Sequence, residues 1–188
     1  TILRGANLSS VDMRNANLQS ADMSKTDLSN ADLRQTALLG AKLLDAQLRG
    51  ADLSKADLRL ADMRRSSLNF ATLNGADMRN SFLRHTDLSF SDLTAADLRS
   101  ADLRNANLQN ANLTRADLRN ADLRRVDLRH AILDDAKVER VDWLEYWSVH
   151  KDAPKRVLSL VKAYSIDPIP RNDIDGSKEY YVIRRKEH

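Results

Sequence analysis

The sequence predicts an all-β solenoid, a chain wound into stacked coils, on the strength of three observations. A large apolar residue recurs at every fifth position from Leu3 to Trp143. A small residue stands two positions before each of these, and Asp or Asn usually lies between, as in Ala101-Asp102-Leu103-Arg104-Asn105. The two positions that complete each unit are variable and mostly polar.

A period of five fits neither a straight helix nor a flat strand. On an α-helix, residues five apart are rotated by roughly 140° and form no stripe. On a flat strand, an odd spacing turns every second apolar side chain toward solvent. A chain that bends once per unit avoids both problems, because its small and large apolar residues point inward while the two variable residues turn the corner. Repetition then gives a narrow core of leucine and alanine.

The unit resembles that of pentapeptide-repeat proteins, in which a small residue, Asp or Asn, and Leu or Phe precede two variable residues. The resemblance runs in register through residues 1–141. It implies a right-handed quadrilateral β-helix, with four units in each coil and about seven coils in all. We therefore expect a pentapeptide-repeat domain over 1–141, with its backbone groups paired from coil to coil and unpaired edges only at its ends.

Composition changes after residue 141, where we expect a small C-terminal cap over 142–188. Both tryptophans, all four tyrosines and all three prolines lie in this segment. An N-cap at Asp142 predicts a helix over about 143–150, Pro154 predicts a second over about 154–164, and a short strand is expected over about 179–184. Alternatively, the segment docks a partner or forms a dimer. The side chains assigned to the cap are Trp143, Trp147, Val157, Leu158, Val161 and Tyr164.

Composition also limits the classes of function. The 188 residues contain no cysteine, which excludes disulfides and thiolate metal sites, and carry a formal net charge of +3. No apolar stretch approaches the length of a membrane-spanning helix, so we expect no membrane partner. We expect a cytoplasmic protein, and whether a cap or a targeting segment lies upstream of Thr1 stays open.

The repeats contain no pattern that predicts an enzyme, a metal site or a cofactor. His85 and His130 fall at corners on different faces, where they form neither a catalytic triad nor a metal site. Hydroxyl groups in the small position are expected to act as core spacers bonded to backbone. These hydroxyls belong to Thr26, Thr36, Ser66, Ser81, Thr86 and Ser91.

Residues twenty apart should stack, which sorts the variable residues into columns along the rod. Two columns are arginine ladders with aspartates beside them, and we expect internal acid–base pairs. The alternative is that the ladders bind phosphates or carboxylates. Because aspartates neutralise the field, we do not expect nucleic acid as a partner. The first ladder is Arg59, Arg79, Arg99 and Arg119 beside Asp57, Asp77, Asp97 and Asp117; the second is Arg64, Arg84, Arg104 and Arg124 beside Asp62, Asp102 and Asp122.

Six apolar side chains stand outside the core pattern and are candidates for partner binding. Contiguous exposed apolar residues can mark a contact site, although the same residues could simply shield the turns. Phe70 and Phe90, twenty apart, should stack at one corner, with Phe82 on the neighbouring face. Leu39 and Leu60 should share one face, and Leu44 should lie across the adjoining corner.

The sequence therefore predicts a non-enzymatic scaffold, bacterial or cyanobacterial, that binds an unidentified protein partner through a face or corner patch. A homodimer through one end of the solenoid is a further expectation. Some members of the resembled family modulate type II topoisomerases by imitating duplex DNA, as in quinolone resistance. That function implies an acidic rod with phenylalanine in the core, whereas this chain matches its aspartates with arginines and fills the core with Leu and Met. Topoisomerase modulation and polyanion binding through the arginine ladders are the alternatives.

Overall fold

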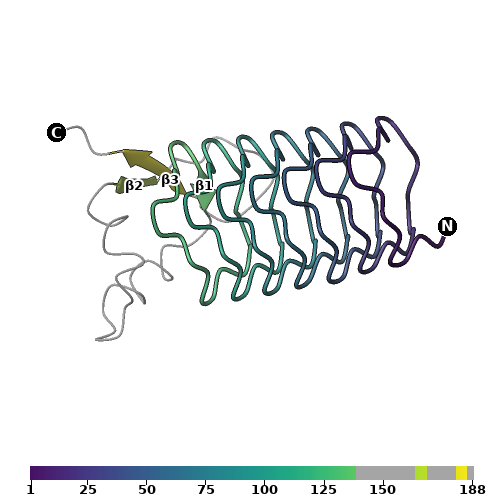
Figure 1. The fold of residues 1–188 in the computed structure, drawn as a ribbon. Helices are drawn as coiled ribbons and strands as arrows, with labels where there is room; N and C mark the ends of the chain where they lie inside the picture. The colour runs from purple at the N-terminus through teal and green to yellow at the C-terminus, as the bar shows by residue number, and fades with distance from the viewer. Residues whose placement is uncertain (139–163, 169–180, 186–188) are drawn as a thin grey trace.

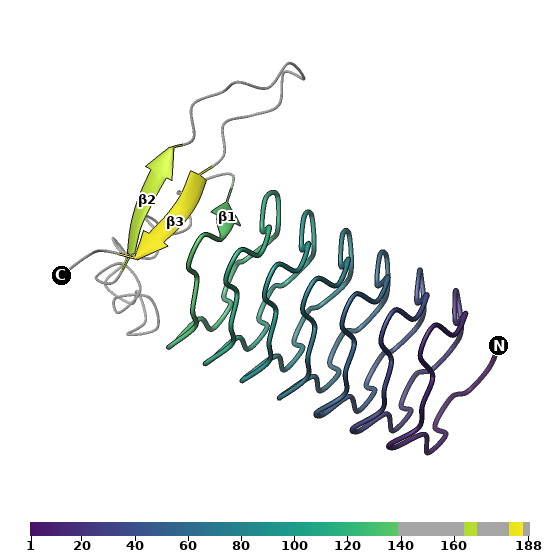
Figure 2. The same ribbon diagram turned by 90° about the horizontal axis from the view of Figure 1, so that it is seen from above.

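The computed structural model describes residues 1–138, 164–168 and 181–185. Residues 1–138 form a solenoid whose coils stack along one axis (Figure 1). Parallel bridges join residues twenty apart, from Ile2 with Asp22 to Asp117 with Lys137, so that each coil takes twenty residues. Viewed from above, successive coils lie parallel to one another along the rod (Figure 2).

Each five-residue unit consists of a straight side of three residues and a corner of two. The corner is closed by a backbone hydrogen bond, as where Ala31 N donates to Leu28 O at 3.0 Å. The second corner residue has a positive φ, which is 58° at Leu60 and 62° at Phe70. Type II turns require this conformation at their third residue. Glycine and asparagine adopt it readily, whereas other residues do so at a cost of about 1 kcal/mol.

Backbone groups on the sides pair with the coils before and after. Leu28 N donates to Gln47 O at 2.7 Å, and Gln47 N donates to Thr26 O at 2.9 Å. Because every unit repeats this pattern, the hydrogen bonds run along the whole rod and fix the register between coils.

The core is a column of leucine, methionine and alanine side chains inside the coils. The central apolar residues from Leu28 to Leu113 are at most 1% exposed. Hydroxyls in the small position bond to backbone as expected: Thr26 Oγ1 donates to Leu3 O at 3.0 Å, and Thr86 Oγ1 to Met63 O at 2.8 Å. The exception is Ser81, whose Oγ is buried without a partner.

Three short strands follow at the C-terminal end of the solenoid. They are β1 (Lys137–Val138), β2 (Tyr164–Pro168) and β3 (Tyr181–Arg185), in the sheet order β1-β3-β2. Lys137 bridges Asp117 in the preceding coil and pairs with Val182 of β3 on its other edge. A strand of the C-terminal segment therefore covers this edge of the last described coil, within two residues of the range expected from sequence.

The expectation that a helix extends to Tyr164 is wrong. Tyr164 is the first residue of β2 and pairs antiparallel with Arg185. Apolar Tyr164 and Ile166 alternate with Ser165 and Asp167, which is the period of a strand. The expected helices over 143–150 and 154–163, with Trp143, Trp147, Val157, Leu158 and Val161, lie outside the described residues. Within the described residues, no helix has the length and apolar character needed to cross a membrane.

The unpaired hydroxyl of Ser81 makes a testable prediction about stability. The equivalent residue is alanine in the coils on both sides, at Ala61 and Ala101. We expect Ser81→Ala to stabilise the protein by about 1 kcal/mol, because a buried polar group without a partner is removed and the cavity is unchanged. Equilibrium urea unfolding measures the difference, and a loss of stability in the variant would contradict the assignment. Thr86→Val, which removes a bonded hydroxyl, serves as the control and should not stabilise.

Candidate functional site

Ten units carry an aspartate that forms a two-point pair with the arginine two residues later. The Nη2–Oδ2 distances are 2.6–2.8 Å and the Nε–Oδ1 distances are 2.7–3.0 Å. The same Oδ1 accepts the backbone N–H of the arginine, as from Arg59 to Asp57 at 3.2 Å. Aspartate thus caps the turn and orients the arginine at the same time. The arginines are Arg14, Arg34, Arg59, Arg64, Arg79, Arg99, Arg104, Arg119, Arg124 and Arg129.

The first ladder is continuous from coil to coil. Arg59 Nε lies 3.7 Å from Asp77 of the next coil, and Arg79 Nε lies 3.6 Å from Asp97. Arg59, Arg79 and Arg99 therefore each contact their own carboxylate and the next one along the rod. The expected acid–base ladder is present here, and these arginines already have carboxylate partners.

The pairing lowers the pKa of the aspartates. Hydrogen bonds from the Arg14 side chain and backbone lower the pKa of Asp12 from 3.8 to about 2. Hydrogen bonds from the paired arginine side chains lower the pKa of Asp57, Asp62 and Asp122 in the same way. These carboxylates are therefore ionised at neutral pH, and the surface of the rod is a mosaic of both signs.

Arg84 departs from this pattern because Phe82 stands where its aspartate would be. Its guanidinium lies beside the carboxylate of Asp102 in the next coil, with Nε–Oδ2 at 3.9 Å. That carboxylate is already held by Arg104 at 2.7 Å. The second ladder therefore contains one arginine without a two-point partner in its own unit.

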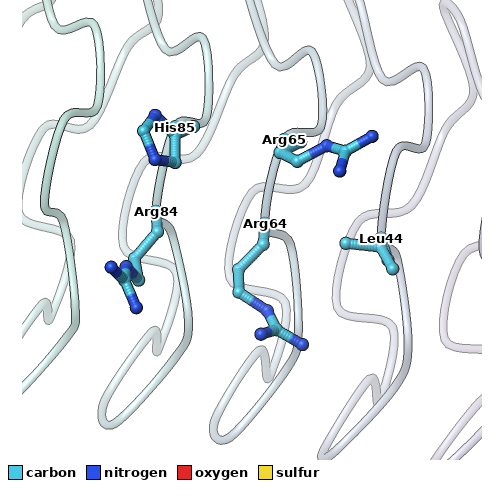
Figure 3. Close-up of a pocket in the computed structure, with 5 residues that line it drawn as sticks. All are labelled: Leu44, Arg64, Arg65, Arg84 and His85. Carbon is cyan, nitrogen blue, oxygen red and sulfur yellow. The ribbon is translucent and has the colours of Figure 1, made fainter.

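Arg84 lies at a corner where basic side chains from successive coils surround a shallow hollow of about 300 Å³. Leu44, Arg64, Arg65, Arg84 and His85 line it, and we call this set the basic corner. Figure 3 shows the side chains projecting from three neighbouring coils, with Arg64 and Arg84 side by side. Arg64 is paired with Asp62 at 2.6 Å and Arg65 with Asp45 at 2.8 Å.

Phe70 and Phe90 form an exposed aromatic stack at the next corner along the chain. Their rings are 5.0 Å apart between centroids and 8° from parallel, and the side chains are 49% and 53% exposed. Arg49 of the preceding coil lies over the Phe70 ring at 5.0 Å from its centroid. The expected stacking is therefore present. Phe82 is on the preceding side, separated from Phe90 by a corner and the side formed by 86–88.

The remaining apolar candidates lie at the corner on the other flank. Leu39 and Leu60 are in adjacent coils of this corner, where Leu60 is 51% exposed and Leu39 is half-buried. Leu44, also half-buried, belongs to the basic corner. All six apolar candidates therefore lie on, or at the edges of, the two adjoining sides that meet at the basic corner.

These two sides combine charged, aromatic and aliphatic side chains at the surface. Within the described residues, no group of three histidine or acidic side chains is placed to hold a metal ion. The hollow offers guanidinium donors, an exposed imidazole and the apolar edge of Leu44, and the exposed Phe82 precedes Arg84 by two residues. Sequence reasoning identified most of these residues separately but did not bring them together as one hollow.

The lowered pKa of the paired aspartates makes a prediction about acid stability. A folded-state pKa below the unfolded value gives stability that is complete above the unfolded pKa, near 3.8, and is lost as pH falls through the folded pKa. We expect the melting temperature to change little between about pH 7 and 5 and to fall between about pH 4 and 2. Thermal melts followed by circular dichroism test this. A fall that is complete above pH 5, or a profile that is flat down to pH 2, would contradict it.

Comparison with known proteins supports the architecture. The model of the family described as "Pentapeptide repeats" matches in eight copies, over residues 1–35, 26–65, 41–80, 66–105 and 106–142. No curated protein sequence matches the chain significantly.

Solved structures provide a second comparison. A pentapeptide repeat protein of the Arabidopsis thaliana thylakoid lumen is 35% identical over 54% of this chain and 71% of its own, with a TM-score of 0.53. QnrB1, a plasmid-mediated fluoroquinolone resistance protein, is 22% identical over 73% of this chain and 69% of its own, with a TM-score of 0.52. At this identity the similarity to QnrB1 is evidence for the fold only. These relatives imply a right-handed β-helical solenoid. With the family model matching from residue 1 to residue 142, the chain belongs to the pentapeptide-repeat family.

Proposed function

We propose that this chain is a rigid, non-enzymatic rod of about seven coils that binds a protein partner through the two sides meeting at the basic corner. The observation that carries the proposal is the exposed stack of Phe70 on Phe90. Aromatic side chains dominate the energetics of protein interfaces, and contiguous exposed ones are unusual on a surface otherwise covered by ion pairs.

The backbone at these two phenylalanines strengthens the proposal. Phe70 and Phe90 hold φ at 62° and 58°, a conformation unfavourable for a bulky residue. In the same corner column, Asn30 and Asn110 hold φ at 57°, where asparagine is well tolerated. The fold therefore accepts a residue at this corner that is polar and less strained. The ring stack and the Arg49 contact offset part of this backbone strain, and binding of a partner would offset the rest.

Position within the rod also favours one continuous surface. Along one coil the chain passes from Leu60 at one corner, through Asp62, to Arg64 and Arg65 at the basic corner, and on to Phe70. The centre of this surface is basic and both of its edges are apolar. Such a mixture suits a protein partner better than a polymer of phosphates, which favours a uniformly cationic groove.

Topoisomerase modulation and polyanion binding remain alternatives with less support. Imitation of duplex DNA calls for a row of unneutralised carboxylates, whereas Asp57, Asp77 and Asp97 are paired with arginines. The same pairs occupy the guanidiniums that a polyanion would need. A supercoiling assay with a type II topoisomerase, and the salt dependence of DNA binding, would distinguish these two alternatives from protein binding.

The double variant Phe70→Asn/Phe90→Asn tests the proposal. We expect the variant to melt within a few degrees of the parent protein, because asparagine relieves backbone strain of about 1 kcal/mol per site while the stack is lost. We also expect capture of specific partners from a lysate of the source organism to fall severalfold, measured by quantitative mass spectrometry against the parent protein.

Ile132→Asn is the matched control, since Ile132 is 38% exposed, lies two coils beyond Phe90 on a side away from the basic corner, and has Asn112 as its column neighbour. It should leave capture unchanged. Equal capture by the parent and the double variant would overturn the proposal for this stack. A large loss of melting temperature in the double variant would show instead that the two phenylalanines serve the fold.

A further inference from the structure

Positive charge is concentrated along the whole corner column that contains the basic corner and along the side that carries Phe82. Nine cationic residues lie in these columns against five aspartates, whereas the whole chain has a net charge of only +3. The local excess therefore exceeds that of the entire chain. The cations are Arg4, Lys25, Lys42, Arg64, Arg65, Arg84, Arg104, Arg124 and Arg125, and the aspartates are Asp22, Asp45, Asp62, Asp102 and Asp122.

The excess is greatest where two residues replace aspartate in the column between Asp22 and Asp102. Lys42 adds a positive charge, and Phe82 removes the carboxylate that would pair with Arg84. In the equivalent unit of the preceding coil, Arg64 and Asp62 keep the two-point pair at 2.6 and 2.7 Å. The 3.9 Å contact of Arg84 with Asp102 leaves its two-point hydrogen-bonding edge able to receive another oxyanion.

From this geometry we infer that the basic corner is an anion site for a carboxylate side chain of an acidic segment in the protein partner. Arg84 receives the carboxylate on its two-point edge, and Arg64 and His85, which line the same hollow, flank it. Leu44 and Phe82 contact the apolar part of the same segment. The inference rests on the proposed function and names the chemistry that the partner must offer.

A carboxylate fits this site better than a nucleic-acid backbone does. A phosphate backbone gains affinity from many cations spaced along its length. Here the neighbouring Arg64 and Arg104 each hold a carboxylate of their own, at 2.6 and 2.7 Å. The incompletely paired guanidinium is therefore local, limited to Arg84, and the 44% exposed Phe82 precedes it by two residues. A short acidic and apolar peptide matches both the size and the polarity of the hollow.

The test uses the full 188-residue chain labelled with ¹⁵N and the peptide hexaglutamate as the probe, with hexaserine as the uncharged comparison. We expect the side-chain Nε–Hε resonance of Arg84 to shift and saturate with hexaglutamate and to stay in place with hexaserine. Phe82→Asp restores the aspartate found in the neighbouring coils, so it should fold normally and weaken hexaglutamate binding about fivefold, the value of one exposed ion pair. Arg84→Gln should weaken it by a similar factor.

Thr72→Asp is the matched control, because it adds the same charge in the column of Asp52 and Asp92 on the opposite side of the rod. Binding should then change by less than about twofold, as expected for distant exposed charges. Unchanged affinity in Phe82→Asp would overturn the inference. An equal loss of affinity in Phe82→Asp and in the control Thr72→Asp would also overturn it. Stronger binding of inorganic phosphate or duplex DNA than of hexaglutamate would also overturn it. Because no natural partner is needed, failure here is distinguishable from failure of the proposed function, which the lysate experiment decides.

Discussion

The solenoid depends on the corner that closes every fifth residue. At each corner a carbonyl such as Leu28 O accepts the N–H three residues later, and the second corner residue holds a positive φ. Because the chain turns in this way four times per coil, each residue returns beside the one twenty positions earlier. A slip of one residue would turn every leucine toward solvent, so the register is strongly fixed. Which side chains become neighbours on the surface follows from this register.

Aspartate in the position before the central apolar residue has two roles, and replacing it changes both. Asp57 Oδ1 accepts the backbone N–H of Arg59 at 3.2 Å and its Nε at 2.8 Å, so one carboxylate caps the turn and neutralises the guanidinium. Phe82 provides neither the acceptor nor the charge. The exposed ring and the incompletely paired Arg84 therefore have the same origin in the single residue Phe82.

The sequence was sufficient to predict whatever depends only on register. The stack of Phe70 on Phe90 and the pairing along the first arginine ladder were predictable because residues twenty apart must meet. The hollow at the basic corner was missed, although its signal was present: Phe82 interrupts a column between Asp62 and Asp102, two residues before Arg84. After the repeats end near residue 142, no period fixes the neighbours. Strand β2 depends on pairing with β3, a contact that local propensity does not encode.

The distribution of the exceptional residues argues for function over folding. Asn30 and Asn110 show what fits the corner column of Phe70 and Phe90, and aspartate fills the column of Phe82 in both adjacent coils. At each of these positions a less strained or better paired residue would fit the fold, yet the sequence has a phenylalanine. Exceptions of this kind are expected at functional sites, where local rules are broken for a gain made elsewhere. Substitutions occur on the other sides too, as at Ile132, but the three phenylalanines and Leu60 lie on, or at the edges of, two adjoining sides with the basic corner between them. One contact surface requires this arrangement.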